Sequence, residues 1–274
     1  MKNLNTTLPF RYPGGKFYAI NLLEPFWDSV EHTEYREPLA GGATVFFAKP
    51  KATKNWLNDL DSELMICYQS MQNPDSRARM ALELANETAT KERWKEILNT
   101  QPKDNYEIGK RYYFLNRTSF SGKLVSPAWG YRPKRSLPPE RWGERIIPCG
   151  KYLENVKLTN IDFSEVIRAD GKDVLLYVDP PYFLPPKHKH YRFGFDLKDH
   201  IRLANELKNT NHKFFLTYDD CQEIRDLYSW ANIFPVEFFY RIDNSSARGG
   251  KRKVGFELII TNFELKNNQL KLEY

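Results

Sequence analysis

The clearest pattern in the chain is a short apolar run that ends in two prolines. Residues 174–178 read Val-Leu-Leu-Tyr-Val, and residues 179–183 read Asp-Pro-Pro-Tyr-Phe. A continuous apolar run of this length predicts a central strand that is covered on both faces, as in an α/β sheet. Each proline fixes its own φ angle, so a stiff segment beyond the strand presents the side chains of Asp179 and Tyr182. Ligands of open α/β sheets bind at such strand ends.

Strand and helix patterns alternate on both sides of a central interruption. The polar and apolar positions predict strands that end near residue 37 and within residues 56–61, 156–163, 213–218, 234–241 and 255–261, and helices within residues 16–26, 62–70 and 197–207. The last two strands are predicted to be antiparallel. Between about residues 74 and 158 the alternation stops, and residues 76–98 and 105–114 are predicted to be helical. The fold class is therefore α/β with a mostly helical insertion.

The composition favours an intracellular protein without a metal site. A chain of 274 residues allows one large α/β domain, or one catalytic domain that carries a smaller insertion. It has no apolar run of membrane-spanning length, and residues 1–7 have no secretory apolar region, so we expect it to be cytoplasmic. Cys67, Cys149 and Cys221 are odd in number and widely separated, which argues against a disulfide framework or a zinc site. His188 and His190 lack acidic or cysteine companions, so no metal site is predicted there.

Basic residues gather in two segments of a chain whose formal net charge is +6. One segment is 111–145 and the other is 241–253. In residues 115–135 the basic side chains alternate with aromatic residues and turn formers, a mixture that predicts a loop or hairpin lying on a phosphate backbone. A solvated basic surface is the alternative.

The Asp-Pro-Pro-Tyr motif has the groups that methylation of an exocyclic amine requires. Such an amine needs hydrogen-bond acceptors, so that its nitrogen lone pair turns toward an electrophile and its proton can later leave. Asp179 and the carbonyl of Pro180 supply two acceptors. A planar base removed from a helix needs a ring to stack on, and Tyr182 offers one. A strand followed by a turn with an exposed Asp and Tyr is the alternative for these four letters alone.

Three stretches near the N-terminus fit the binding of a nucleoside cofactor. Pro13-Gly14-Gly15-Lys16 lets backbone approach a ligand closely, although a plain turn before a helix explains it equally. The small residues 41–43 follow a predicted strand end and offer bare backbone. Asp59 lies about 20 residues further on, where α/β folds bind a ribose diol, and Asp61 is predicted to cap the next helix.

In their order along the chain, these stretches resemble a known family. Asp179-Pro180-Pro181-Tyr182 resembles the catalytic motif of the amino-group DNA methyltransferases, and the other stretches resemble the Dam-like adenine-N6 branch over residues 10–262. The resemblance implies a Rossmann-like, S-adenosylmethionine-dependent methyltransferase sheet built from residues 1–73 and 156–274, with a target-recognition insertion at 74–155. It implies methyl transfer to N6 of a flipped adenine in double-stranded DNA, without a covalent enzyme intermediate. It leaves open whether a cognate restriction endonuclease acts on the same site.

The resemblance also assigns roles to individual residues. The residues assigned to catalysis are Asp179, Pro180 and Tyr182. The residues assigned to the cofactor are Tyr12, Lys16, Glu37, Gly41, Asp59, Asp162 and Asp179, where Asp162 could equally cap a helix at 164–167. The residues assigned to DNA are Arg117, the wedging aromatic Phe120, Arg132, Lys134, Arg135, Arg248, Lys251, Arg252 and Lys253. One glycine of the family's turn falls on Ala43, whose methyl group would crowd the cofactor or demand a different turn.

Other functions fit parts of the same pattern. Cytosine-N4 methylation uses the same site geometry, and a catalytically silent DNA-binding protein could keep the fold. A methyltransferase for RNA or for a small amine is a further alternative. Pro148-Cys149 resembles the nucleophile dipeptide of cytosine-C5 methyltransferases, but its surroundings do not match, so a structural cysteine is predicted.

Overall fold

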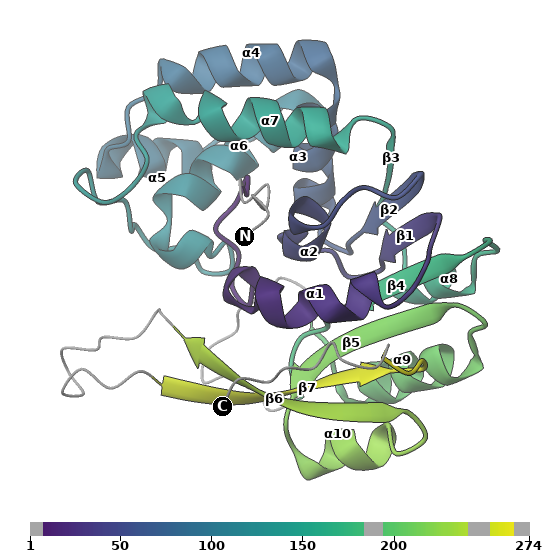
Figure 1. Ribbon diagram of the computed structural model, residues 1–274. Helices are drawn as coiled ribbons and strands as arrows, with labels where there is room; N and C mark the ends of the chain where they lie inside the picture. The colour runs from purple at the N-terminus through teal and green to yellow at the C-terminus, as the bar shows by residue number, and fades with distance from the viewer. Residues whose placement is uncertain (1–7, 184–193, 241–252, 266–274) are drawn as a thin grey trace.

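The centre of the molecule is a mixed sheet whose strands follow the order β3-β2-β1-β4-β5-β7-β6 (Figure 1). The computed structural model describes residues 8–183, 194–240 and 253–265. The seven strands of this sheet are β1 Glu34–Glu37, β2 Lys54–Asn58, β3 Val156–Thr159, β4 Val174–Val178, β5 Lys213–Asp219, β6 Asn232–Tyr240 and β7 Lys253–Thr261. The first five are parallel, β7 is antiparallel to β5, and β6 is antiparallel to β7. The predicted α/β class and the antiparallel C-terminal pair are confirmed.

The predicted central strand is β4, and all five of its residues are buried. It lies between β1 and β5, and successive side chains point to opposite faces. Leu175 and Tyr177 belong to one hydrophobic cluster, and Leu176 and Val178 belong to another. Both faces of β4 are therefore shielded from water, which explains why its side chains are all apolar and do not alternate between polar and apolar.

Helices cover both faces of the sheet (Figure 1). One cluster joins the sheet to α1 Ile20–Asp28, α2 Thr44–Ala48 and α3 Ser62–Gln72. The other joins it to α8 Phe163–Arg168, α9 Leu197–Asn209 and α10 Gln222–Leu227. A short 3-10 turn, η1 Phe17–Ala19, precedes α1. α10 was not predicted from the sequence, and it is only six residues long.

The interrupted part of the chain forms a helical layer beside α3 (Figure 1). It contains α4 Pro74–Ala85, α5 Lys91–Asn99, α6 Asn105–Thr118, η2 Phe120–Gly122, η3 Pro139–Arg141 and α7 Gly143–Leu153. The helical stretch predicted at 76–98 is two helices, because the hydroxyl of Thr90 accepts from the amide of Arg93 and starts α5 as a new helix. The prediction had no helix at α7.

The helical layer shares its core with the sheet. α3 packs against both α6 and α7, and a single hydrophobic cluster extends from Leu175 of β4 to Trp142 and Ile146 at the start of α7. Asn73 lies between α3 and α4, and its side chain accepts from the amide of Ser76, so the chain changes direction there. The predicted insertion begins at the next residue, 74.

Candidate active site

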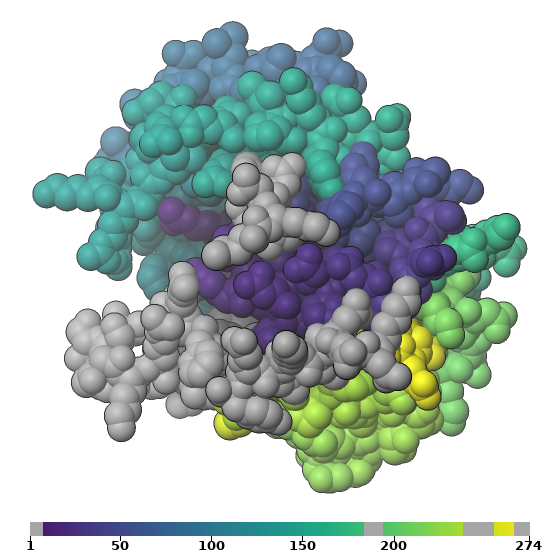
Figure 2. Space-filling model, viewed as in Figure 1, coloured from purple at the N-terminus to yellow at the C-terminus, as the bar shows by residue number. Residues whose placement is uncertain are grey.

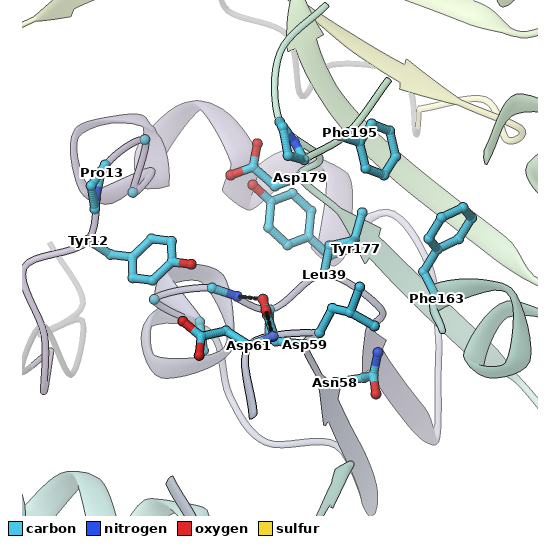
Figure 3. A pocket seen from close by; sticks show the side chains of 18 of the residues that line it. Tyr12, Pro13, Leu39, Asn58, Asp59, Asp61, Phe163, Tyr177, Asp179 and Phe195 are labelled. Carbon is cyan, nitrogen blue, oxygen red and sulfur yellow. Dashed lines mark hydrogen bonds between the residues drawn. The ribbon is translucent and has the colours of Figure 1, made fainter. Parts of the chain in front are cut away.

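A cleft lies at the carboxyl ends of the parallel strands, beside the place where the strand order reverses between β1 and β4. Open α/β sheets bind ligands at this position, because the loops diverge there. Its empty space, counted out to the surrounding solvent, is about 1040 Å³. The predicted site residues that line it are Tyr12, Lys16, Gly41, Asp59, Asp162 and Asp179. Figure 3 shows how several of these side chains converge from separate segments of the chain.

Lys16 and Asp179 form an ion pair at the carboxyl end of β4. Lys16 is only 7% exposed, and its Nζ donates to Asp179 Oδ1 at 2.7 Å and to the carbonyl of Gly14 at 3.2 Å. The same nitrogen lies 4.8 Å from the centroid of the Tyr182 ring. The resemblance assigned Lys16 to the cofactor and Asp179 to both catalysis and the cofactor, and the structure brings these two side chains together. Pro180 is buried behind them, and Pro181 lines the cleft.

A second donor to Asp179 comes from β5. Thr217 is fully buried, and its Oγ1 donates to Asp179 Oδ1 at 2.7 Å. The hydroxyl of Tyr177 lies 3.3 Å from Thr217 Oγ1, and Tyr177 also lines the cleft. The sequence reasoning missed both residues. The one signal that could have identified Thr217 is a hydroxyl inside an otherwise apolar strand.

Bare backbone forms one wall of the cleft. Gly41 has a φ of +47°, and a Cβ added there would meet the ring of Tyr12 at 2.7 Å. A Cβ added at Gly42 would meet the Cβ of Tyr12, also at 2.7 Å. Glycine is therefore required at both positions if Tyr12 is to lie against the turn. The hydroxyl of Tyr68 donates to the carbonyl of Gly41 at 2.8 Å and fixes the turn from below.

Ala43 adopts a left-handed conformation, with φ 47° and ψ 40°, at the start of α2. It is 1% exposed and belongs to the core as well as to the cleft lining. An alanine in this region costs about 1–2 kcal/mol. The turn thus keeps a glycine-like backbone at Ala43 although the residue carries a methyl group.

Asp59 ties the glycine turn to the end of β2. Its Oδ2 accepts from the amide of Gly41 at 2.8 Å, and its Oδ1 accepts from the amide of Asp61 at 2.9 Å (Figure 3). Burial raises the pKa of Asp59 to about 6, against these hydrogen bonds, which lower it. Asp61 caps α3 by accepting from the amide of Leu64, as predicted.

Glu37 lies below the cleft and is 1% exposed. Its Oε1 accepts from the hydroxyl of Tyr35 at 2.6 Å and from the amide of Phe46 at 2.8 Å. Ala43 at the N-cap of α2 has no side-chain acceptor, so Glu37 satisfies one of the free amides of that helix. Burial raises the pKa of Glu37 to about 8. The side chain predicted to bind the cofactor therefore supports α2, which borders the cleft.

The far end of the cleft is aromatic and charged. Asp162 caps α8 through the amide of Ser164 and also pairs with Arg202 at 2.6 Å. Burial would raise the pKa of Asp162, but the hydrogen bonds from Arg202 and Ser164 outweigh it and lower the pKa to about 2. The predicted helix cap is therefore confirmed, and Asp162 also lines the cleft, while its contact with a cofactor stays a prediction. The rings of Phe163 and Phe195 lie 5.8 Å apart on this side (Figure 3).

The predicted DNA-contacting residues differ in exposure. Phe120 is 54% exposed, at a hairpin-like bend in which its amide donates to the carbonyl of Ala128. Figure 2 shows the connection between α6 and α7 projecting from the side of the helical layer. The exposed basic residues on this connection include the predicted DNA contacts Arg132, Lys134 and Arg135.

Arg117 is placed differently. It lies in α6 and is 8% exposed, and its Nε has no hydrogen-bond partner among the described residues. Burial lowers the pKa of its guanidinium. Three further predicted residues, Arg248, Lys251 and Arg252, lie outside the described residues, and Lys253 is the first residue of β7.

The described residues also bear on a cysteine nucleophile, a metal site and a membrane span. Cys149 is buried in α7, and burial raises the pKa of its thiol to about 12, which disfavours a nucleophilic thiolate and fits the predicted structural role. Within the described ranges, no three His, Cys, Asp or Glu side chains are grouped to hold a metal ion. Over the same ranges, no helix has the length and apolar character needed to cross a membrane.

Comparisons with known proteins show which family the chain belongs to. The model of the D12 class N6 adenine-specific DNA methyltransferase family matches residues 12–242. The chain is 26% identical to type II methyltransferase M.CviBI of Paramecium bursaria Chlorella virus NC1A, over 94% of this chain and 98% of that protein. It is 27% identical to type II methyltransferase M.MjaIII of Methanocaldococcus jannaschii, over 84% and 88%. It is 24% identical to the DNA N-6-adenine-methyltransferase of Escherichia phage P1, over 91% of this chain and 34% of that protein. These matches confirm the family predicted from the motifs: the chain belongs to the D12 class N6 adenine-specific DNA methyltransferases.

Proposed function

We propose that this adenine-N6 DNA methyltransferase takes its methyl group from S-adenosylmethionine and acts on an adenine turned out of double-stranded DNA. The observation that carries the proposal is the carboxylate of Asp179, which lies in the cleft at the end of β4 and is held there by Lys16 at 2.7 Å. A carboxylate fixed at the edge of a nucleoside-sized cleft can accept a hydrogen from an exocyclic amine.

The residues present fit S-adenosylmethionine. Gly41 and Gly42 would hold its methionine part against bare backbone, with Tyr12 packed beside them. Asp59 would accept hydrogen bonds from the ribose, and Phe163 would pack against the adenine. When bound, this cofactor supplies a methyl group on a sulfonium, which an amine nitrogen can attack. The fit rests on these hydrogen-bonding groups and on Gly41 and Gly42, where a Cβ would clash with Tyr12.

The chain's own residues then orient the target base. Asp179 Oδ1 is occupied by Lys16 and Thr217, and Oδ2 has no partner among the described residues. Oδ2 is therefore the oxygen that accepts a hydrogen of the target amine, and the carbonyl of Pro180 is proposed as the second acceptor. Tyr182 is proposed to stack on the extruded base, with Lys16 beside its ring. Catalysis in this scheme comes from positioning and hydrogen-bond acceptance, and no covalent bond to the enzyme forms.

The helical layer supplies the proposed DNA contacts. Arg132, Lys134 and Arg135 are exposed on the projecting connection and are placed to neutralise phosphates. Phe120 is the exposed apolar side chain on the same connection, which suits a wedge that enters an opened base stack. Two relatives are named type II methyltransferases, which supports a further proposal that this enzyme acts alongside a restriction endonuclease of the same target site.

The proposal is tested by product analysis. Labelled methyl is transferred from S-adenosylmethionine to duplex DNA of mixed sequence, and the modified nucleoside is identified after digestion. N6-methyladenine is the expected product. N4-methylcytosine would show that the target base is cytosine and not adenine. The absence of product on DNA and RNA would leave only a binding protein with this fold.

A variant tests the role of the carboxylate. Asp179→Asn keeps the shape of the side chain but removes its charge, so turnover is expected to fall by about 10²- to 10⁴-fold. DNA affinity is expected to stay within about threefold, because the exposed basic residues lie elsewhere. Undiminished turnover in Asp179→Asn would remove Asp179 from the mechanism.

A further inference from the structure

We propose that β5 contains two positioning residues, Thr217 and Asp219, which hold the two ends of the catalytic segment 179–183. The inference rests on the proposed function, because it assigns Asp179 to the target amine. Thr217 and Asp219 are two residues apart on a strand, so their side chains point to the same face of the sheet. Both are buried, with 0% and 8% exposure.

Thr217 orients the catalytic carboxylate. The strands β4 and β5 are in parallel register, with Val178 opposite Leu216, so Asp179 emerges opposite Thr217. An ionised carboxylate only accepts, so the 2.7 Å bond runs from Thr217 Oγ1 to Asp179 Oδ1. The hydroxyl of Tyr177, 3.3 Å from Thr217 Oγ1, is then the donor to Thr217. In Figure 3 the hydroxyl end of Tyr177 lies beside the Asp179 carboxylate.

The bond from Thr217 determines which carboxylate oxygen of Asp179 faces the substrate. Lys16 and Thr217 both donate to Oδ1, from opposite parts of the chain, and neither donates to Oδ2. Two donors on one oxygen fix the rotation of the carboxylate, and the second oxygen is left to face the substrate. Lys16 alone would not fix it, because an ammonium is a point charge on a flexible stem.

Asp219 holds the other end of the segment. Its Oδ1 accepts from the backbone amide of Phe183 at 2.9 Å. The two prolines between Asp179 and Phe183 restrict the backbone further. Thr217 and Asp219, two residues apart on β5, thus hold Asp179 and Phe183, the two ends of the segment, which are four residues apart. This spacing keeps the ring of Tyr182, the residue before Phe183, at a set distance from the carboxylate.

The experiment compares variants of Thr217 by single-turnover kinetics. Thr217→Val keeps the shape of the side chain but removes the hydroxyl, and the methyl-transfer rate constant is expected to fall by about 10- to 100-fold. The dissociation constants for S-adenosylmethionine and for duplex DNA are expected to stay within about threefold. Thr217→Ser keeps the hydroxyl and is expected to restore the rate to within about threefold of wild type.

A purely structural role predicts another result. It would lower the melting temperature and the active fraction in all variants, but it would leave the rate constant of the active fraction unchanged. That outcome overturns the proposal, as does a normal rate constant in Thr217→Val. Thr217→Ala is the second test variant, and failure of both Val and Ala variants to fold would assign the hydroxyl to stability and would also overturn it.

Asp219 supplies a matched pair of variants. Asp219→Asn keeps an oxygen that can accept from Phe183, whereas Asp219→Ala does not, so only the alanine variant is expected to lose rate. Equal rates in the two variants contradict the role of Asp219. Asp179→Asn is the reference for the underlying function: if it retains full turnover, the role of Asp179 fails, whereas loss of turnover in Asp179→Asn with a normal Thr217→Val rejects only the present inference.

Discussion

Replacing Glu37 with glutamine is expected to remove a loss of stability that the protein undergoes as the pH rises. Burial raises the pKa of Glu37 from 4.5 to about 8 in the folded state. Between these two pH values the folded state holds a proton that the unfolded state has released. The stability from this proton is therefore fully present below pH 4.5 and is lost as the pH rises toward 8.

The magnitude follows from the width of the window. Each pH unit in which the two states differ by one proton changes the free energy of unfolding by about 1.4 kcal/mol. Burial raises the pKa of Asp59 to about 6, so its effect ends near pH 6. Burial lowers the pKa of Lys49 from 10.5 to about 8, so its effect begins near pH 8. The window from pH 6 to 8 isolates Glu37 from these two groups, and the expected loss over it is about 2 to 3 kcal/mol.

The assay is urea unfolding at pH 6, 7 and 8 for wild type and for Glu37→Gln. The glutamine oxygen can still accept from Tyr35 and Phe46, but it does not titrate, so the slope of stability against pH is expected to be smaller in the variant. Histidine contributions are common to both proteins and cancel in the difference. Glu237→Gln, at an exposed position on β6, is the matched control and should follow wild type. Parallel curves for wild type and Glu37→Gln would refute the raised pKa.

Three further predictions concern binding. Replacing Arg132, Lys134 and Arg135 with alanine should weaken duplex binding on all sequences and reduce the slope of log affinity against log salt by about 2 to 3. An unchanged slope in a salt titration would show that these residues do not contact the DNA. Phe120→Ala should slow base extrusion, measured with a fluorescent base analogue at the target, while phosphate-driven affinity persists. Gly42→Ala should raise the dissociation constant for S-adenosylmethionine at least about tenfold, because its Cβ would displace Tyr12, and normal cofactor binding by calorimetry would contradict that wall of the cleft.

The sequence predicted the parts of the fold and site that depend on local signals. The apolar run of β4 and the prolines after it located Asp179 correctly at a strand end. Asp61 was recognisable as a helix cap, because capping is a matter of residue type and a spacing of three. Such features need no knowledge of which strands are neighbours.

The remaining features depend on contacts between distant segments. Lys16 and Asp179 are separated by 163 residues, and their pairing joins the turn before η1 to the end of β4. Thr217 lies beside Asp179 because β4 and β5 are parallel and in register, and a hydroxyl in an apolar run does not by itself show that neighbour. Arg117 was predicted to contact DNA, and only the packing of α6 into the helical layer shows that this side chain is buried. No periodicity within a single segment contains this information.

The positions of Glu37 and Asp179 explain why the two carboxyl groups can lie at neighbouring strand ends. The charge on Asp179 helps to raise the pKa of Glu37, after the larger effect of burial. Below about pH 8 Glu37 is therefore mostly uncharged, and the one negative charge at the ends of β1 and β4 is that of Asp179, which Lys16 compensates at 2.7 Å. An unpaired second charge in this buried position would cost several kcal/mol. The neutral form of Glu37 avoids that cost and still accepts from the amide of Phe46, so the same side chain supports α2 without adding a second negative charge near Asp179.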